Sequence, residues 1–575
     1  MRPTLIILST LSAVTWGQPA GHKLAAELRN TASDATVDVI VQYRQPPTAA
    51  HHRRVLESGG QLKRDLNIIR SAHYSLSARQ VEALSKDPDV EFISPDRAVF
   101  ATGSTAPYQG NPDYGWRTVG ADLATNVFGF KGNGVGVAVI DSGIRDHDDL
   151  SANQDGRGGV IYAASLLSGP GASDDYGHGT HVAGIISGDG TDSTGGGFTY
   201  TVRGIAPNVN IISLRVLDRN GAGTDSAVIA AIQQAISLKN RYNIRVINLS
   251  LGRPVTSSCT TDPLCQAVQR AWQAGIVVVV AAGNLGRDNS LGTNGYGTIT
   301  APGNSPYAIT VGAMNTVGSL TSADDKIASY SSKGPTSIDH IVKPDLVAPG
   351  NRVLSLRTDG STLDTSFPGN QVAKSVIKDS NSSNATEYYV LSGTSMAAPM
   401  VSGAAALLIQ QDPSLTPDQV KARLMKTATK FAPGYSTATD PVTGVTYTSE
   451  YDIFTVGAGY LNIPAALTNR DEITGPALSP TATFDVASGN VYVSPTGAAA
   501  VWGTAAVWGT AAVWGTNVFL SGTAAVWGTG AVWGTAAVWG TGTPQAFAAV
   551  WGTAAVWGTG QTSGESIMVA VKGDN

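Results

Sequence analysis

The 575-residue sequence has few charged residues, only two cysteines and no long apolar segment. Asp, Glu, Lys and Arg make up 14% of the chain, and its net charge is −5. The lack of a basic excess argues against a nucleic-acid-binding surface, and two cysteines are too few for a disulfide-rich scaffold or a structural zinc cluster. No apolar run approaches the ~18–20 residues that span a bilayer. We therefore expect no nucleic-acid partner and no transmembrane segment.

The N-terminus is typical of an exported protein. Arg2 precedes an apolar stretch from Leu5 to Val14, and small residues follow up to Gly17. This order predicts a secretory signal over residues 1–17 and a secreted, extracellular protein. A short apolar strand at the N-terminus is the alternative interpretation.

Residues 34–100 differ in composition from the rest, with nine basic and nine acidic side chains. Valine alternates with other residues over 37–41, which is strand periodicity. We expect a polar helix over 53–70, a short helix capped by Ser77 and a further strand near 90–93. This region is predicted to be a small α+β domain.

From about residue 110 to 467, short apolar β-branched segments alternate with helical ones. The predicted strands are 136–140, 209–214, 245–249 and 276–282, and the clearest predicted helices are 225–238 and 262–274. Such alternation predicts an α/β domain with a doubly wound, mostly parallel sheet. Functional sites in these sheets gather at the carboxyl ends of the strands.

The C-terminal region, residues 468–575, contains a repeat. Val-Trp-Gly-Thr occurs eight times, beginning at Val501, Val507, Val513, Val526, Val532, Val538, Val550 and Val556. A short fixed period predicts repetitive structure, either hairpins or a β-solenoid. A low-complexity linker is the alternative.

Three polar residues fall at the expected ends of such elements. Asp141 ends a buried strand, His178 begins a helix between glycines, and Ser395 precedes an apolar helix expected over 400–410, with Pro399 in its first turn. A catalytic serine needs a base that takes its proton and a third group that orients the base. These residues are therefore candidates for that arrangement.

A helix N-terminus also favours the oxyanion of a tetrahedral intermediate. Asn284 follows the apolar segment 276–282 and is a candidate for a further oxyanion donor. Each candidate has a simpler alternative. Asp141 could cap a strand, His178 could be a packed structural histidine, Ser395 could cap a helix, and Asn284 could be a turn residue.

The three segments VIDSG around Asp141, GHGTHVAG around His178 and SGTSMAAP around Ser395 resemble, in order and spacing, those of the subtilisin-like serine proteases. The resemblance implies that Asp141 orients the base His178, that Ser395 is the nucleophile and that Asn284 contributes to the oxyanion hole. It also implies protein and peptide substrates and no cofactor for catalysis. Residues 34–100 resemble the family's propeptide, which acts as an intramolecular chaperone and inhibitor.

Two segments match those that flank the bound peptide in that family. They are Gly221-Ala222-Gly223 and Ser250-Leu251-Gly252. Glycine permits close approach of a substrate backbone, and the family binds its substrate as an added strand. Ordinary loop glycines are the alternative. In the family the C-terminal strand of the propeptide lies in this cleft, so the resemblance implies that the segment around residues 97–100 pairs with both segments.

Two further expectations concern stability. Asp149 matches a calcium-ligand position in some relatives, although the companion loop over 188–200 is rebuilt here. Cys259 and Cys265 are close in an exported chain, with turn-forming residues between them, which predicts a disulfide. Two separate buried thiols are the alternative.

The sequence therefore predicts a secreted serine endopeptidase made as a self-processing zymogen. Two other classes of function remain open at this point. One is a catalytically silent subtilisin-like fold that serves as a binding module. The other is a structural or adhesive protein whose essential part is the tryptophan-rich repeat.

Overall fold

The computed structural model describes residues 23–29, 35–101, 115–151, 158–169, 171–290, 292–379, 384–431, 434–471, 475–485, 490–494, 518–520 and 574. The expected signal over residues 1–17 and the eight Val-Trp-Gly-Thr repeats lie outside these ranges. The chain divides into two compact units, one of residues 1–65 and 70–95, the other of residues 66–69 and 96–575. Within the described ranges, every helix is too short or too polar to cross a lipid bilayer.

The first unit is a small α+β fold built on a four-stranded sheet in the order β2-β3-β1-β4. Its elements are η1 (Ala26–Leu28), β1 (Thr36–Tyr43), α1 (Ala49–Glu57), β2 (Gln61–Leu66), β3 (Ser71–Ser77), α2 (Ala78–Ser85) and β4 (Val90–Pro95). Val55 of α1 and Val81 of α2 join a buried core with Val39 and Val41 of β1. The side chain of Ser77 caps α2, as the sequence predicted.

The expected helix over 53–70 is wrong beyond Glu57. Two glycines follow α1, and Gly59 has a φ of 93° that turns the chain out of the helix. A Cβ on Gly60 would lie 2.3 Å from the side chain of Leu76, so the backbone there approaches β3 closely. The residues after the glycines therefore form β2 instead of a second half of the helix.

The second unit is built on an eight-stranded, mostly parallel sheet with the order β14-β13-β12-β10-β6-β8-β7, in which β15 also pairs with β13. The strands are β6 (Gly136–Asp141), β7 (Gly159–Ser165), β8 (Asn210–Arg215), β10 (Ile244–Leu249), β12 (Val277–Ala281), β13 (Ile309–Asn315), β14 (Lys326–Ile327) and β15 (Leu346–Pro349). Only β14 runs antiparallel to its neighbour. The mostly parallel α/β fold expected from the sequence is confirmed.

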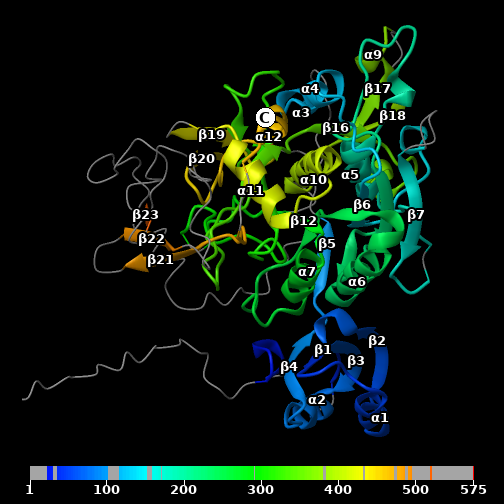
Figure 1. Cartoon of the computed structure of the whole chain (residues 1–575), viewed down its shortest axis with the longest axis vertical. Coiled ribbons are helices and arrows are strands. Elements are labelled where there is room, and N and C mark those ends of the chain that lie inside the picture. The colour runs from blue at the N-terminus through cyan, green and yellow to red at the C-terminus, as the bar shows by residue number, and fades with distance from the viewer. Residues whose placement is uncertain are drawn as a thin grey trace, which may run out of the picture. The chain divides into compact units, whose positions relative to one another are not determined.

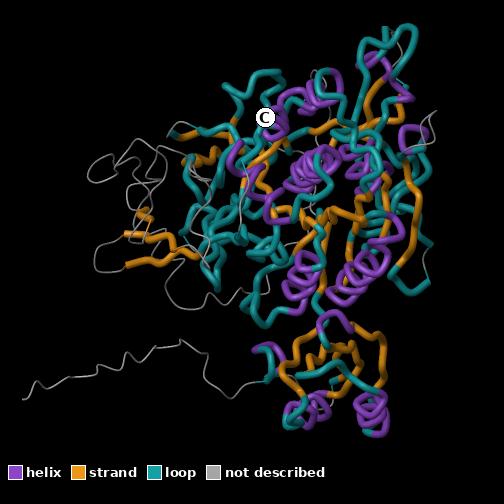
Figure 2. The backbone as a smooth tube through the Cα atoms, in the orientation of Figure 1, coloured by secondary structure: helices purple, strands orange, loops and turns teal. Residues whose placement is uncertain are grey.

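Two pairs of helices cover this sheet (Figure 1). Helices α5 (His178–Ser187) and α10 (Thr394–Gln411) pack against each other and contact β6, β10, β12 and β13. Helices α6 (Asp225–Tyr242) and α7 (Pro263–Gln273) form the other pair and contact β6, β10 and β12. Figure 2 shows the strands of the sheet between these helices.

Smaller elements surround the main sheet. The three-stranded sheets are β11-β5-β9, β16-β18-β17 and β21-β22-β23, and β19 pairs with β20. Their strands are β5 (Ala98–Ala101), β9 (Ala222–Thr224), β11 (Leu251–Gly252), β16 (Val353–Leu356), β17 (Gln371–Ala373), β18 (Ala385–Leu391), β19 (Tyr435–Thr439), β20 (Thr446–Glu450), β21 (Thr481–Asp485), β22 (Asn490–Ser494) and β23 (Val518–Leu520). The remaining helices include α3 (Gly115–Thr118), α4 (Ala121–Asn126), η3 (Asp148–Leu150), η4 (Thr191–Ser193), α8 (Thr362–Ser366), α9 (Lys374–Ile377), α11 (Pro417–Thr427) and α12 (Ile463–Thr468).

The helix that carries the serine motif begins earlier than the sequence predicted. It starts at Thr394 instead of Met400, so Pro399 lies inside it and not in its first turn. A proline at that position cannot donate to the carbonyl of Ser395, four residues before it. The hydroxyl of Ser250 donates to that carbonyl instead, at 2.8 Å. This tertiary hydrogen bond compensates for the missing helical one.

Candidate active site

Asp141 and His178 are joined directly. The Nδ1 atom of His178 lies 2.7 Å from Oδ1 of Asp141, and both side chains are buried. Asp141 is the last residue of β6, and His178 is the first residue of α5. A carboxylate at this distance holds the imidazole in the tautomer that carries its proton on Nδ1, which leaves Nε2 as an acceptor.

Asp174, which no sequence pattern singled out, holds the two segments that carry this pair. Its carboxylate accepts from the Ser142 hydroxyl at 2.9 Å and from the backbone N–H and hydroxyl of Thr180 at 2.9 and 2.8 Å. The Ser142 hydroxyl in turn accepts from the N–H of Gly179 at 2.9 Å. Asp174 is fully buried, and burial raises its pKa. It is therefore a positioning residue for the Asp141–His178 pair.

Ser395 lies in the first turn of α10 and is buried. Its hydroxyl donates to the Ser250 carbonyl at 3.0 Å, while the Ser250 hydroxyl donates to the Ser395 carbonyl at 2.8 Å. Ser250 itself accepts from the side-chain amide of Asn248 at 2.9 Å. This reciprocal pair fixes the first turn of α10 to the end of β10.

Asn284 follows β12, and its side-chain amide has a defined orientation. Its Oδ1 accepts from both the backbone N–H and the hydroxyl of Thr394, each at 3.0 Å. The Nδ2 group is buried and has no hydrogen-bond partner among the residues that the structure describes. A buried donor without an acceptor is costly, so this group is suited to an oxygen atom supplied by a ligand.

The sheet explains why these residues can meet. Strands β6, β10 and β12 are adjacent and parallel, so their carboxyl ends lie at one edge. Asp141 ends the first of them, Ser250 follows the second and Asn284 follows the third. Helices α5 and α10, which begin with the His178 and Ser395 segments, pack against each other. The structure thus brings all four sequence-predicted catalytic candidates to this edge of the fold.

A strand of the chain itself lies between the two predicted substrate-binding segments. Strand β5 pairs antiparallel with β9, where Val99 is opposite Gly223 and Phe100 is opposite Ala222. It also pairs antiparallel with β11, where Phe100 is opposite Gly252. The sequence predicted this pairing for the segment around residues 97–100. An extended peptide can therefore be held here by backbone hydrogen bonds on both sides.

Gly223 and Gly252 of these segments pack closely against other residues of the second unit. A Cβ on Gly223 would lie 2.3 Å from the carbonyl oxygen of Val216, and one on Gly252 would lie 2.7 Å from the hydroxyl of Thr300. The expected reason for these glycines was the close approach of a substrate backbone. The contacts show that packing inside the second unit by itself excludes a larger residue at both positions; the approach of a substrate backbone stays a prediction.

The residues before β5 bind the N-terminus of α6. The Asp96 carboxylate accepts from the Ser226 N–H at 2.7 Å and from the Ser226 hydroxyl at 2.6 Å. The carbonyl of Arg97 accepts from the N–H of Asp225 at 2.8 Å. An acidic side chain is favourable at this position because the first backbone N–H groups of a helix lack helical acceptors.

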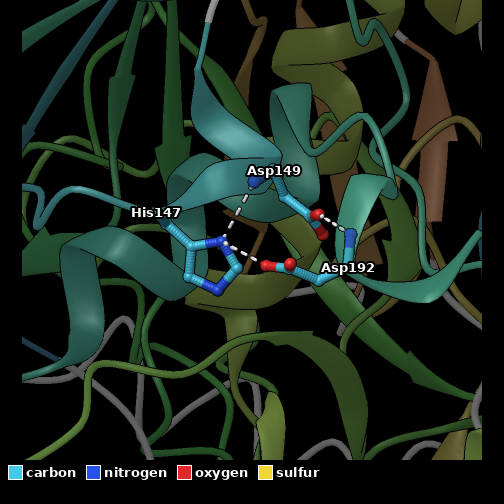
Figure 3. Close-up of side chains that lie close together, drawn as sticks. All are labelled: His147, Asp149 and Asp192. Atoms are coloured by element: carbon cyan, nitrogen blue, oxygen red, sulfur yellow. Dashed lines mark hydrogen bonds and ion pairs between the residues drawn. The ribbon is translucent and has the colours of Figure 1, made fainter.

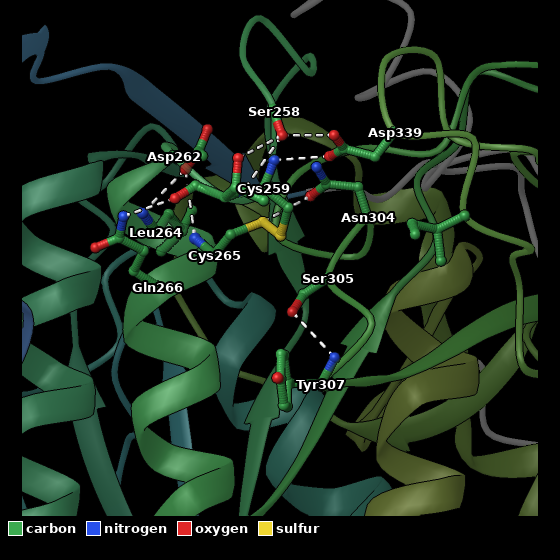
Figure 4. Close-up of a disulfide and its surroundings, with 12 residues drawn as sticks. Ser258, Cys259, Asp262, Leu264, Cys265, Gln266, Asn304, Ser305, Tyr307 and Asp339 are labelled. Carbon is green, nitrogen blue, oxygen red and sulfur yellow. Dashed lines mark hydrogen bonds between the residues drawn. A yellow bond between two sulfur atoms is a disulfide. The ribbon is translucent and has the colours of Figure 1, made fainter. Parts of the chain in front are cut away.

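Cys259 and Cys265 form the predicted disulfide (Figure 4). The short loop it closes precedes α7 and is held by further hydrogen bonds. The N–H of Cys259 donates to Asp339 at 2.7 Å, and Asp262 caps α7. The bond therefore stabilises the entry into α7.

His147, Asp149 and Asp192 form a small cluster that could hold a metal ion (Figure 3). Both oxygens of the buried Asp149 carboxylate already accept hydrogen bonds, from the Asp192 N–H at 2.7 Å and from the Tyr388 hydroxyl at 2.8 Å. Burial raises the pKa of Asp149 to about 6. Calcium prefers six to eight oxygen ligands, so this imidazole-containing set departs from the calcium site that the resemblance implied for Asp149.

His181, the second histidine of the segment GHGTHVAG, is a core residue. Its Nε2 group lies 3.1 Å from each of the carbonyl oxygens of Val353 and Tyr389. The side chain is fully buried, and burial lowers its pKa to about 3. It is therefore neutral at the pH values at which most proteins work.

Comparisons with known proteins agree with this geometry. Residues 132–448 match the profile of the subtilase family. The chain is 40% identical to serine protease AprX of Bacillus subtilis strain 168 over 305 residues, which is 52% of this chain and 62% of AprX. It is 33% identical to subtilisin E of the same strain over 395 residues, covering 68% of this chain and 84% of subtilisin E.

Among solved structures, fervidolysin from Fervidobacterium pennivorans, a keratinolytic enzyme related to subtilisin, has a similar fold. The TM-score is 0.55 at 22% identity, and the match covers 79% of this chain and 63% of fervidolysin. The family match spans more than half of the sequence, and subtilisin E is matched over most of its length. The chain therefore belongs to the subtilase family of serine endopeptidases, which use an Asp/His/Ser triad.

Proposed function

We propose that this protein is a secreted serine endopeptidase that cleaves proteins through an acyl-enzyme and is made as a self-processing zymogen. The observation that carries the catalytic part is the 2.7 Å contact between His178 and Asp141, at the same sheet edge as Ser395. The apolar N-terminal stretch and the disulfide support secretion, because disulfides persist in oxidising compartments.

In the proposed reaction, the Ser395 oxygen attacks the carbonyl carbon of a peptide bond while His178 Nε2 takes the hydroxyl proton. Asp141 stabilises the imidazolium that forms. The proton then passes to the departing amine nitrogen, and the peptide bond breaks. A water molecule, deprotonated by His178, cleaves the acyl-enzyme and restores Ser395.

Asn284 is the proposed side-chain donor to the oxyanion, together with the Ser395 backbone N–H. Its Nδ2 group is suited to this role because Thr394 holds the other end of the amide. A donor that is already oriented needs no rearrangement as negative charge develops on the oxygen. The N-terminus of α10 adds its positive dipole end.

Strands β9 and β11 are the proposed binding site for the substrate backbone. In the precursor, β5 occupies this position. Ser395, the proposed nucleophile, lies just beyond the end of the β5–β11 pairing, because its hydroxyl donates a hydrogen bond to the carbonyl of Ser250, the residue before β11. We therefore propose that the enzyme cuts its own chain within a few residues after Ala101.

The first test compares the wild type with Ser395→Ala. The wild type should hydrolyse casein and be labelled by a serine-directed phosphonate, whereas the variant should do neither. The expected loss in kcat is about 10⁶, a magnitude measured for the nucleophile of a subtilisin. Equal labelling of the two proteins would identify a different nucleophile, and unlabelled, inactive wild type would favour the silent binding module.

The second test addresses self-processing. N-terminal sequencing of the mature wild type should begin shortly after residue 101, and purified Ser395→Ala precursor should remain uncut. Added active enzyme should cut the variant precursor at the same place. A Ser395→Ala precursor that matures alone would show that another protease performs the cut.

A further inference from the structure

The second unit contains a buried site that is filled by Asp574, a residue far along the chain from the residues that bind it. This residue is only 1% exposed. Its carboxylate accepts from Arg287 Nη2 at 2.8 Å, from the Ser329 hydroxyl at 2.6 Å and from the Ser329 N–H at 2.6 Å. Three donors from two separate loops thus converge on one carboxylate.

The backbone of Asp574 is bound as well. The side-chain amide of Asn351 accepts from the Asp574 N–H at 2.8 Å and donates to the Asp574 carbonyl at 3.1 Å. These two hydrogen bonds fix the direction in which the bound chain runs past Asn351 and place Asp574, and not a neighbouring residue, opposite it. The site therefore recognises a peptide residue and not merely an anion.

The arrangement of Arg287 makes the site selective for a carboxylate. Its other terminal nitrogen lies 3.1 Å from Asp440, and its guanidinium lies 5.8 and 5.7 Å from the ring centroids of Tyr330 and Tyr447. Asp440 and Asp574 share the single positive charge of Arg287, and the ion pair with Asp440 together with the two rings holds the guanidinium with Nη2 toward Asp574. Without Asp574, the backbone N–H and the hydroxyl of Ser329 would lose the acceptor that they have here, which is unfavourable in a buried site.

The chemistry of the donors explains why aspartate fits. An ionised carboxylate offers four lone-pair positions, and here it receives three donors. An asparagine would lose the ionic attraction to Arg287 and present an N–H₂ group to at least one of these donors. The longer glutamate could not keep both the backbone contact to Asn351 and the carboxylate contact to Ser329.

The site is built on loops that also support the catalytic candidates. Arg287 is three residues after Asn284, and the Leu285 N–H donates to the Ser332 hydroxyl at 3.0 Å. Next to Asn351, the Gly350 carbonyl accepts from the Gly393 N–H at 2.7 Å. An occupant of the site therefore contacts the segments behind both the oxyanion donor and the nucleophile.

We propose that this site, formed by Arg287, Ser329 and Asn351, is a receptor for Asp574 of the same chain, so that the repeat-containing tail is held to the protease at both ends. Before Asp574, the last residues that the structure describes are those of β23, which ends at Leu520, fifty-four positions earlier. A chain of that length can span well over the diameter of one domain at ~3.3 Å per residue. Binding within one molecule is also favoured by the high effective concentration of a tethered ligand.

The test uses full-length precursor in the Ser395→Ala background, which keeps the chain intact. Lys572 is two residues before Asp574, so trypsin should cut after it slowly while the site is filled. With the additional Asp574→Asn change, this cut should become at least tenfold faster, measured by intact mass as the loss of the last three residues. Glu565→Gln removes the same charge elsewhere in the tail and should leave the rate unchanged. Equal rates in all three proteins would overturn the proposal.

A second measurement distinguishes binding within one chain from binding between two. Sedimentation of the Ser395→Ala precursor should show a monomer with and without Asp574→Asn. A dimer that dissociates on this substitution would mean that the site receives the tail of a second copy, and would overturn the intramolecular assignment. A labelled peptide of residues 570–575 should also bind a chain that ends at residue 573. The peptide with Asp574→Asn should bind at least tenfold more weakly, and equal binding of the two peptides would contradict the selectivity.

Discussion

Ser250 and Ser395 are held together by two reciprocal hydrogen bonds, each from the hydroxyl of one to the carbonyl of the other, at 2.8 and 3.0 Å. One of them exists because Pro399 cannot donate to the Ser395 carbonyl within α10. The proline inside α10 is therefore linked to the contact that holds the nucleophile Ser395 against Ser250.

This relationship predicts the effect of Ser250→Ala. The change removes the hydroxyl that donates to the Ser395 carbonyl and should cost about 1–3 kcal/mol in the free energy of unfolding. In a Pro399→Ala background, the backbone N–H of residue 399 can donate to the Ser395 carbonyl. Ser250→Ala should then lower the free energy of unfolding by less than about 1 kcal/mol. Guanidinium unfolding of the four proteins gives the coupling energy, and additive costs would contradict this explanation.

Asn284→Ala should lower kcat by about 10²–10³ with little change in KM, because one oxyanion donor is lost. This magnitude was measured for such a donor in a subtilisin. Thr394→Val removes one of the two hydrogen bonds that orient the Asn284 amide and should lower kcat by a smaller factor, while Thr394→Ser should retain most of the activity. A loss that appears in KM alone would assign Asn284 to substrate binding.

We propose that residues 34–101, as a separate chain, inhibit the mature enzyme, and Asp96→Ala should weaken this inhibition. The side chain makes two hydrogen bonds to Ser226 at the start of α6. Hydrogen bonds to charged groups contribute about 1.5–3 kcal/mol, so the inhibition constant of a chain of residues 34–101 against the mature enzyme should rise about 10–100-fold. Glu82→Ala changes an exposed charge of the same sign and should have no effect. Equal inhibition by both variants would show that β5 alone provides the affinity.

His181 predicts a loss of stability in acid. Its folded-state pKa is lowered to about 3, whereas a histidine in an unfolded chain titrates near 6.5. Below pH 6.5 the unfolded chain takes up a proton that the folded one does not, so this residue lowers stability by about 1.4 kcal/mol per pH unit as the pH falls toward 3. His181→Gln should flatten the plot of unfolding free energy against pH in this window. Parallel plots for variant and wild type would contradict the assignment.

Removal of the disulfide should have a modest effect. Cys259 and Cys265 close a loop with a sequence separation of 6, and so short a loop contributes at most about 2 kcal/mol through the entropy of the unfolded chain. The variant with both cysteines changed to alanine should therefore melt a few degrees lower and retain its kcat. Loss of activity without loss of stability would mean that the loop before α7 positions the active site.

Much of the fold and of the candidate site follows from local sequence patterns. Strands β6, β8, β10 and β12 are near-continuous apolar runs, which makes them visible without tertiary information. Asp141, His178 and Ser395 were found because each lies in a distinctive segment where such an element ends or begins. The pairing of β5 with β9 and β11 was also predictable, since extended segments on both sides were already recognised.

What the sequence missed depends on contacts between distant segments. Asp174 acts through Ser142 and Thr180, and only the folded chain brings these residues together. The start of α10 was placed too late because Pro399 is tolerated only through the hydroxyl of Ser250. The second half of the expected helix over 53–70 failed because Gly59 and the packing of Gly60 outweigh a polar helical pattern.

The buried position of Asp574 changes what a proteolytic cut in the tail would do. A single cut between Leu520 and Asp574 would leave one piece joined to the protease by a peptide bond. Among the residues that the structure describes, the other piece would be held through Asp574 by Arg287, Ser329 and Asn351. The lifetime of the second piece on the enzyme would then depend on its rate of dissociation and on dilution after export. Shedding of the tail would thus be a reversible, concentration-dependent event, even though the cut that precedes it is not.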